Sequence, residues 1–152
     1  MLNPAARKSP VGLAGRWHVA GKQHPPVLTI GALRRGSGIE QFLGVAEVGG
    51  VAAVRWIAVS PMSGQYRISL HTVRDLDDDR FGDLAEFPSL DPVDEEHVGE
   101  GRELGRCADA EEAIALAERL AGAAPDRWVN FAVAGEEYLD LVRARRRGSP
   151  AP

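Results

Sequence analysis

Residues 39–60, IEQFLGVAEVGGVAAVRWIAVS, are the strongest predictor of this protein's fold. Two apolar runs flank Gly49 and Gly50, and a two-residue Gly-Gly loop suits the positive backbone dihedrals of a type I′ turn. The sequence therefore predicts an antiparallel hairpin in which residues 39–48 pair with residues 51–60.

The register of this hairpin follows from the turn, because Val48 must then face Val51. Counting outward places Phe42 opposite Ile57 and Leu43 opposite Trp56. Both faces of such a hairpin are apolar, so each face must be covered by helices, by another sheet layer or by a second subunit.

Four further segments are expected to be strands. Residues 27–34 form a short β-rich run before a glycine-rich turn, and residues 84–87 and 128–133 are shorter candidates. After residues 61–64 the chain alternates strictly, with Tyr66, Ile68 and Leu70 on one side and Arg67, Ser69 and His71 on the other. This alternation predicts a strand near a sheet edge with one wet face.

The helical signals lie in the C-terminal third. Asp109 and Glu112 form a capping-box pattern ahead of an amphipathic helix over residues 110–121, which Gly122 ends. Residues 136–145 have acids at their start and arginines at their end, as the helix dipole favours, although residues 138–142 also alternate well enough for a strand. The predicted fold class is α+β, a mainly antiparallel β-sheet of five to six strands with a meander start, packed by one or two C-terminal helices.

Length and composition are typical of one globular domain. The chain has 152 residues, of which 44% are hydrophobic and 26% charged. We expect a single α+β domain over residues 17–144, with flexible tails at residues 1–16 and 145–152. No apolar run approaches the roughly 20 residues that cross a bilayer, no secretory signal is evident, and Cys107 is the sole cysteine, so a cytoplasmic location without a membrane association is expected.

Charge is sorted along the chain. Residues 75–103 contain twelve carboxylates against two arginines, a formal charge of −10, whereas the residues before them carry +7 and those after them −1. Clustered charge attracts a partner of the opposite sign, so the first functional hypothesis is a noncatalytic protein-binding module, such as an immunity-type inhibitor, chaperone or adaptor. Its acidic loop would bind a protein with a basic surface through Asp75, Asp77, Asp78, Asp79, Asp83, Glu86, Asp94, Glu95 and Glu96. A solvated loop extended by self-repulsion is the alternative interpretation of the same residues.

Part of this acidic segment has the spacing of a calcium loop. Five carboxylates, Asp75, Asp77, Asp79, Asp83 and Glu86, occupy positions 1, 3, 5, 9 and 12 of a twelve-residue window. However, Arg80 occupies position 6, where an EF-hand loop needs glycine, and the flanks favour strands over helices. The sequence therefore predicts no metal site and no cofactor.

The alternative function is a small-molecule-binding protein or an enzyme with a cleft between sheet and helix. No serine-nucleophile or phosphate-loop motif occurs, and the histidines are scattered, so a polar cavity near His71 or Glu47 is the feature that would favour this alternative. A pI near 5.6 without a basic aromatic stripe argues against nucleic acid as a partner. A homodimer is expected if a second copy covers one face of the hairpin.

Overall fold

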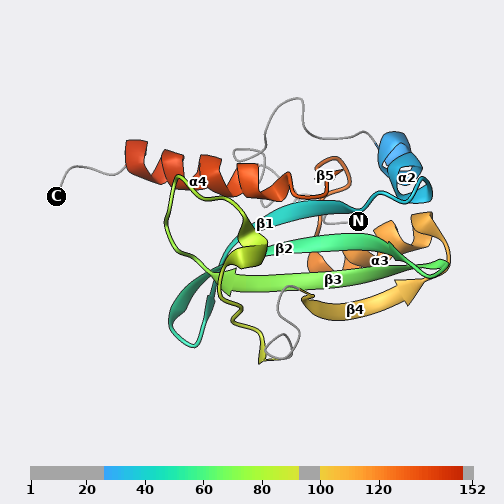
Figure 1. Cartoon of the computed structure of the whole chain (residues 1–152), viewed down its shortest axis with the longest axis horizontal. Helices are drawn as coiled ribbons and strands as arrows, with labels where there is room; N and C mark the ends of the chain where they lie inside the picture. The colour runs from blue at the N-terminus through green and yellow to red at the C-terminus, as the bar shows by residue number, and fades with distance from the viewer. Residues whose placement is uncertain (1–25, 93–99, 149–152) are drawn as a thin grey trace, which may run out of the picture.

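The computed structural model describes residues 26–92 and 100–148, which form an antiparallel sheet with helices around it (Figure 1). The strand order is β4-β3-β2-β1-β5, so the predicted α+β class with five strands is confirmed. The strands are β1 (Ile39–Val48), β2 (Val51–Met62), β3 (Gln65–Arg74), β4 (Arg102–Cys107) and β5 (Val129–Asn130). The helices are α2 (Pro26–Arg34), α3 (Ala110–Ala121) and α4 (Ala134–Gly148), with a 3-10 turn, η2 (Leu84–Glu86). Among the described residues, no helix is long and apolar enough to cross a membrane.

The Gly-Gly turn forms as predicted. Gly49 and Gly50 have φ values of 56° and 83°, a backbone conformation that side chains with a Cβ rarely adopt. Val48 pairs with Val51 across the turn, and the hairpin tip projects beyond the rest of the sheet (Figure 1).

Farther from the turn, the predicted hairpin register is wrong by one residue. The register shifts between Phe42 and Gly44, so Phe42 pairs with Trp56 and neither the Phe42–Ile57 nor the Leu43–Trp56 pairing forms. A β-bulge of this kind sets an extra residue, Leu43, against the partner strand, and Gly44 accommodates the bend with a φ of 101°. As a result Phe42 lies on the same face of the sheet as Trp56.

Residues 27–34, predicted as a strand, belong instead to helix α2. The buried residues of this segment, Thr29, Ala32 and Leu33, follow the i, i+3, i+4 spacing of a helix face. Leu33 and Ala32 belong to the same buried core as Ile39 and Trp128, and this tertiary packing prevails over the β-propensity of the run.

Two other short segments differ from the predicted strands. Residues 84–87 contain η2, which buries Leu84 and Phe87, three residues apart, on one side. The strand predicted over residues 128–133 is limited to β5, because Ala132 has a φ of 76° and ends the extended conformation. The acidic segment of residues 75–103 is not all loop, since Arg102 and Glu103 already belong to β4.

Both C-terminal helices are confirmed. The Asp109 carboxylate accepts the Glu112 N–H at 3.1 Å at the start of α3, and Gly122 ends that helix with a φ of 73°. The strand alternative for residues 138–142 is wrong, because α4 continues from Ala134 through Gly148.

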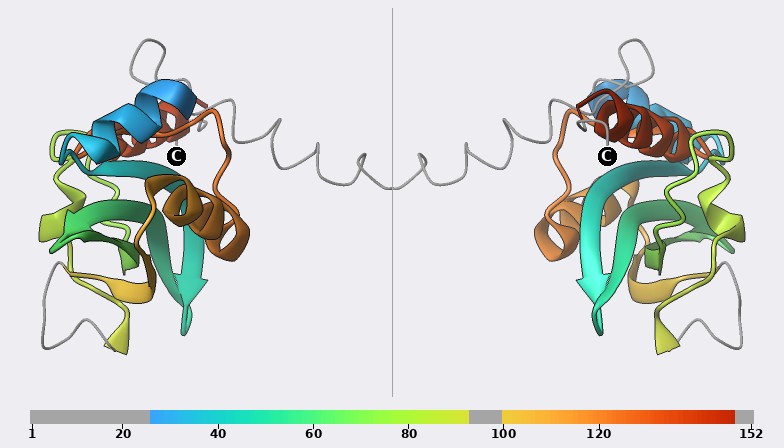
Figure 2. Two further views of the ribbon diagram at one scale, coloured as in Figure 1. Left: turned by 90° about the vertical axis from the view of Figure 1, so that its right-hand side faces the viewer. Right: turned by 90° about the vertical axis from the view of Figure 1, so that its left-hand side faces the viewer.

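The sheet is buried on both faces, with α3 on one side and η2 on the other, while α4 lies over β1 (Figures 1 and 2). The α3-side core contains Ile39, Ile57, Val59, Ile68 and Trp128. The α4-side core contains Phe42, Val54, Trp56, Val73, Phe87 and Tyr138. The C-terminal helix thus covers the second face of the hairpin, and a homodimer stays a prediction.

Candidate ligand-binding pocket

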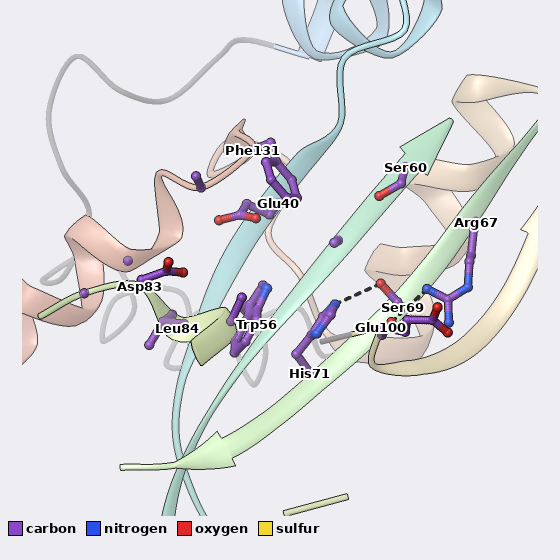
Figure 3. Close-up of a pocket in the computed structure, with 15 residues that line it drawn as sticks. Glu40, Trp56, Ser60, Arg67, Ser69, His71, Asp83, Leu84, Glu100 and Phe131 are labelled. Atoms are coloured by element: carbon purple, nitrogen blue, oxygen red, sulfur yellow. Dashed lines mark hydrogen bonds between the residues drawn. The ribbon is translucent and has the colours of Figure 1, made fainter. Parts of the chain in front are cut away.

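A hollow of about 430 Å³ lies on the α4 side of the sheet, beside the α4-side core (Figure 3). We call it the sheet pocket. Its walls come from β1, β2 and β3, from residues 82–85, from Glu100, and from the turn between β5 and α4. Its polar lining residues include Glu40, Ser60, Arg67, Ser69, His71 and Asp83, and its aromatic ones are Trp56 and Phe131.

The polar side of β3 forms one wall of this pocket. Arg67, Ser69 and His71 alternate with apolar residues along the strand, and the sequence predicted that they face solvent. The structure corrects this prediction, because Ser69 is only 3% exposed and His71 only 7%. Buried polar side chains need partners, so this wall is an arranged set of hydrogen-bonding groups.

The His71 imidazole is held from several directions. Its ring stacks on the Trp56 indole, with centroids 4.4 Å apart and planes at 8°, and its Nε2 lies 3.1 Å from the Ser69 hydroxyl oxygen (Figure 3). Gly101, which has a φ of 74°, lies against the same ring, and a Cβ there would come within 2.8 Å of it. These contacts leave the imidazole in one orientation at the pocket wall.

Glu40 is the buried carboxyl of the pocket, with 4% of the residue exposed. Burial raises the pKa of this carboxyl above its ordinary value of 4.5, and the charge of Asp83 raises it further, although hydrogen bonds from Ala134 and Ala132 act in the opposite direction. The Ala134 N–H donates to Oε2 at 2.9 Å, so Glu40 lies at the positive end of helix α4.

A close approach of two backbones closes the pocket near Asp83. Gly82 and Gly135 lie so near each other that a Cβ on Gly135 would collide with the Gly82 carbonyl, and a Cβ on Gly82 would lie 2.9 Å from the Gly135 carbonyl oxygen. Only glycine fits this crossing, which brings the start of α4 against the segment that carries Asp83.

Arg67 is held at the opposite side of the pocket by the β4 side of the sheet. Its Nε donates to Glu103 at 3.0 Å, its Nη1 to the Glu100 carbonyl at 2.8 Å, and its Nη2 to the Gly101 carbonyl at 3.4 Å. Arg106 and then Arg67 hold the pKa of the Glu103 carboxyl below its ordinary value.

The residues predicted to bind a basic partner do not form one continuous acidic surface. Asp75 and Asp77 are paired with Arg145 at 2.8 and 3.4 Å, and Asp79 lies 3.7 Å from Arg146. The arginines of α4 thus neutralise part of the acidic loop. The remaining members are dispersed: Asp78 lies 3.9 Å from Arg80, Asp83 lines the sheet pocket, Glu86 is exposed in η2, and Asp94, Glu95 and Glu96 lie outside the described residues.

No three His, Cys, Asp or Glu side chains within residues 26–92 and 100–148 are arranged to hold a metal ion. The calcium-like spacing of the acidic segment therefore does not produce a ligand cluster there. Asp75 instead accepts hydrogen bonds from the Tyr138 hydroxyl at 2.9 Å and from the Asp77 N–H at 3.0 Å.

Of the two cavity residues predicted from the sequence, His71 lies in the pocket, but Glu40 lies there in place of Glu47. Both glutamates lie on β1, but Glu47 is exposed near the hairpin tip, whereas Glu40 lies in the pocket. The pocket roles of Trp56 and Phe131 were missed, because no local pattern marks them.

No protein-family model, curated protein sequence or solved structure matches this chain. The pocket must therefore be interpreted from its own residues.

The raised pKa of Glu40 predicts a pH-dependent difference between the wild type and Glu40→Gln. The folded protein holds this proton more tightly than the unfolded chain, so the stabilisation is present below pH 4.5 and is lost as pH rises through the raised pKa. Urea unfolding at pH 4 and pH 8 should show the variant gaining stability relative to the wild type at the higher pH. Glu47→Gln on the same strand is the control, and an equal gain there would contradict the assignment to Glu40.

The Tyr138 hydroxyl is expected to lose its proton at an unusually alkaline pH. Burial, together with the hydrogen bond to Asp75, raises the pKa of this phenol from 10.0 to about 12. The corresponding stability is present below pH 10 and is lost as pH rises through about 12. In a Tyr66→Phe variant, Tyr138 is the remaining tyrosine, and its ultraviolet absorbance should show ionisation near pH 12. Circular dichroism should still report folded protein at that pH. Ionisation near pH 10 would rule out the buried hydrogen bond.

Proposed function

We propose that this protein binds a small molecule in the sheet pocket. The observation that supports the proposal is the convergence of Glu40 and His71, from two different strands, on a hollow of about 430 Å³. Ligand sites in proteins are clefts of roughly 300–1,000 Å³ with apolar walls and a few placed polar groups, and the sheet pocket has this composition.

The cost of burying Glu40 also favours a functional role. A carboxyl whose pKa is raised by burial destabilises the folded state at neutral pH, and such groups cluster at functional sites. A glutamine in this place would avoid that cost and could still accept the Ala134 N–H hydrogen bond. The retained carboxyl is therefore better explained by a ligand than by packing.

Binding of a basic protein by the acidic loop stays a prediction with less support. The α4 arginines already lie on Asp75, Asp77 and Asp79, so the negative charge offered to a partner is smaller than the sequence indicates. A basic partner would have to compete with these internal ion pairs, whereas a ligand in the sheet pocket would leave them intact.

The proposal is tested by screening a fragment library against the purified protein by ligand-observed NMR and measuring each hit by calorimetry. Hits of the sheet pocket should lose at least about tenfold in affinity with Glu40→Gln, which corresponds to about 1.4 kcal/mol. Glu47→Gln should leave their affinity unchanged. A library without hits, or hits that are indifferent to Glu40→Gln, would contradict the proposal.

Catalysis in the same pocket is a second candidate, which the raised pKa of Glu40 favours. A carboxyl whose pKa is raised by burial holds its proton to a higher pH than an ordinary glutamate, as a general acid requires, and His71 lies in the same pocket with its ring oriented. If a hit is converted, Glu40→Gln should slow the reaction by about 10²–10⁴-fold. Product formation at the same rate in the variant would exclude Glu40 as the acid.

A further inference from the structure

We propose that the sheet pocket selects a small organic cation. This cation would have a flat ring that carries an amidinium or ammonium group. This inference rests on the proposed function, because it names the class of ligand that the same pocket takes. It follows from three features: the sign of the pocket's charge, the absence of a basic partner for Glu40 and Asp83 among the described side chains, and the aromatic surface of the pocket.

The first feature is an excess of negative charge. Among the residues that the structure describes, the lining contains three carboxylates, those of Glu40, Asp83 and Glu100, against the single guanidinium of Arg67. All three nitrogens of that guanidinium already donate hydrogen bonds toward the β4 side, to Glu103, Glu100 and Gly101. Arg67 therefore offers little to an anionic ligand.

The second feature is that no basic side chain among the described residues pairs with Glu40 or Asp83, so the charge of Glu40 is offset only by backbone N–H groups near the start of α4. Elsewhere in this protein Asp75, Asp91, Glu103 and Glu137 are each paired with an arginine. Within the described residues, 26–92 and 100–148, no arginine or lysine forms an ion pair with Glu40 or Asp83. The two carboxylates repel each other, and a bound cation relieves that repulsion.

The third feature is the presence of aromatic surface at the pocket wall and rim. Trp56 forms part of the wall, and Phe131 stands at the rim with 66% of its surface exposed (Figure 3). Aromatic faces attract cations and stack on flat groups. A planar cation can therefore direct its N–H groups to Glu40 and Asp83 while its ring contacts Phe131, since one face of the Trp56 indole is covered by His71.

Three probes of nearly equal shape and different charge test this selectivity: benzamidine as the cation, benzamide as the neutral analogue and benzoate as the anion. Titration calorimetry at neutral pH and low salt should show benzamidine binding at least tenfold more tightly than benzamide, with no measurable binding of benzoate. Glu40→Gln and Asp83→Asn should each weaken benzamidine severalfold, and Glu47→Gln should not. Because Asp83 is exposed, its variant keeps the test valid if Glu40→Gln impairs folding.

Each result bears on the inference. Benzamide or benzoate binding as tightly as benzamidine, with the same sensitivity to Glu40→Gln, would overturn cation selection and leave the pocket as a ligand site. Failure of all three probes, when neutral library fragments bind in a Glu40-dependent way, would also overturn cation selection alone. Failure of all three probes and of the whole library would overturn the proposed function as well.

Discussion

Replacing Glu137 by alanine is expected to lower the free energy of unfolding by about 3–5 kcal/mol, the cost of leaving one member of a buried ion pair without its partner. The Glu137 side chain is fully buried, and its Oε1 accepts a hydrogen bond from Arg127 Nη2 at 2.7 Å. This pair joins the turn before β5 to the first turns of α4. The segment between them carries Phe131, Ala132 and Gly135 to the sheet pocket.

Urea unfolding at pH 7 measures this effect, and a double variant provides its control. Arg127→Met combined with Glu137→Leu removes both charges and keeps apolar volume, so it should be more stable than Glu137→Ala. A loss below about 1 kcal/mol in the single variant would show that the pair is accessible to water and does not order the segment.

Gly135→Ala is expected to destabilise the fold by about 3 kcal/mol and to abolish ligand binding, because one added methyl group cannot fit against the Gly82 carbonyl. The collision is with backbone, so relief requires the start of α4 to move away from residues 82–85. That movement takes Gly135 and Ala132 away from the opposite wall of the pocket.

Gly148→Ala is the matched control for this change, since Gly148 ends the same helix and an added Cβ meets nothing within 4 Å. Alanine favours helix over glycine by up to about 1 kcal/mol, so this variant should be unchanged or slightly more stable. A Gly135→Ala protein with wild-type stability and binding would show that the two segments do not cross closely in solution.

The fold was predictable where a local signal existed. Gly49 and Gly50 predicted the hairpin, and Asp109 with Gly122 predicted the helix between them, because turns and caps depend on residues close together in sequence. The bulge at Leu43 has a weaker local signal, the isolated Gly44 within the strand, which does not fix where the register shifts. It inverted the expected face of Phe42, since a shift of one residue moves a strand's side chains to the opposite face.

The site was less predictable, because its parts meet only in the folded chain. Alternation along β3 predicted that Ser69 and His71 share a polar face, but not that this face lines a hollow. Likewise the sequence predicted that the acidic loop is unpaired, whereas Asp75 forms an ion pair with Arg145, a residue 70 positions later in the sequence. Opposite charges so far apart are not matched by any local pattern.

Amide chemical-shift mapping of a library hit on the isotope-labelled protein would locate the ligand directly. We predict that the shifts concentrate at residues 82–85, 100–101 and 131–135 around the sheet pocket, and that they largely disappear in Glu40→Gln but persist in Glu47→Gln. Saturable shifts confined to residues 75–79 and the end of α4, with the sheet pocket unaffected, would contradict a ligand site over the sheet and favour the acidic loop instead.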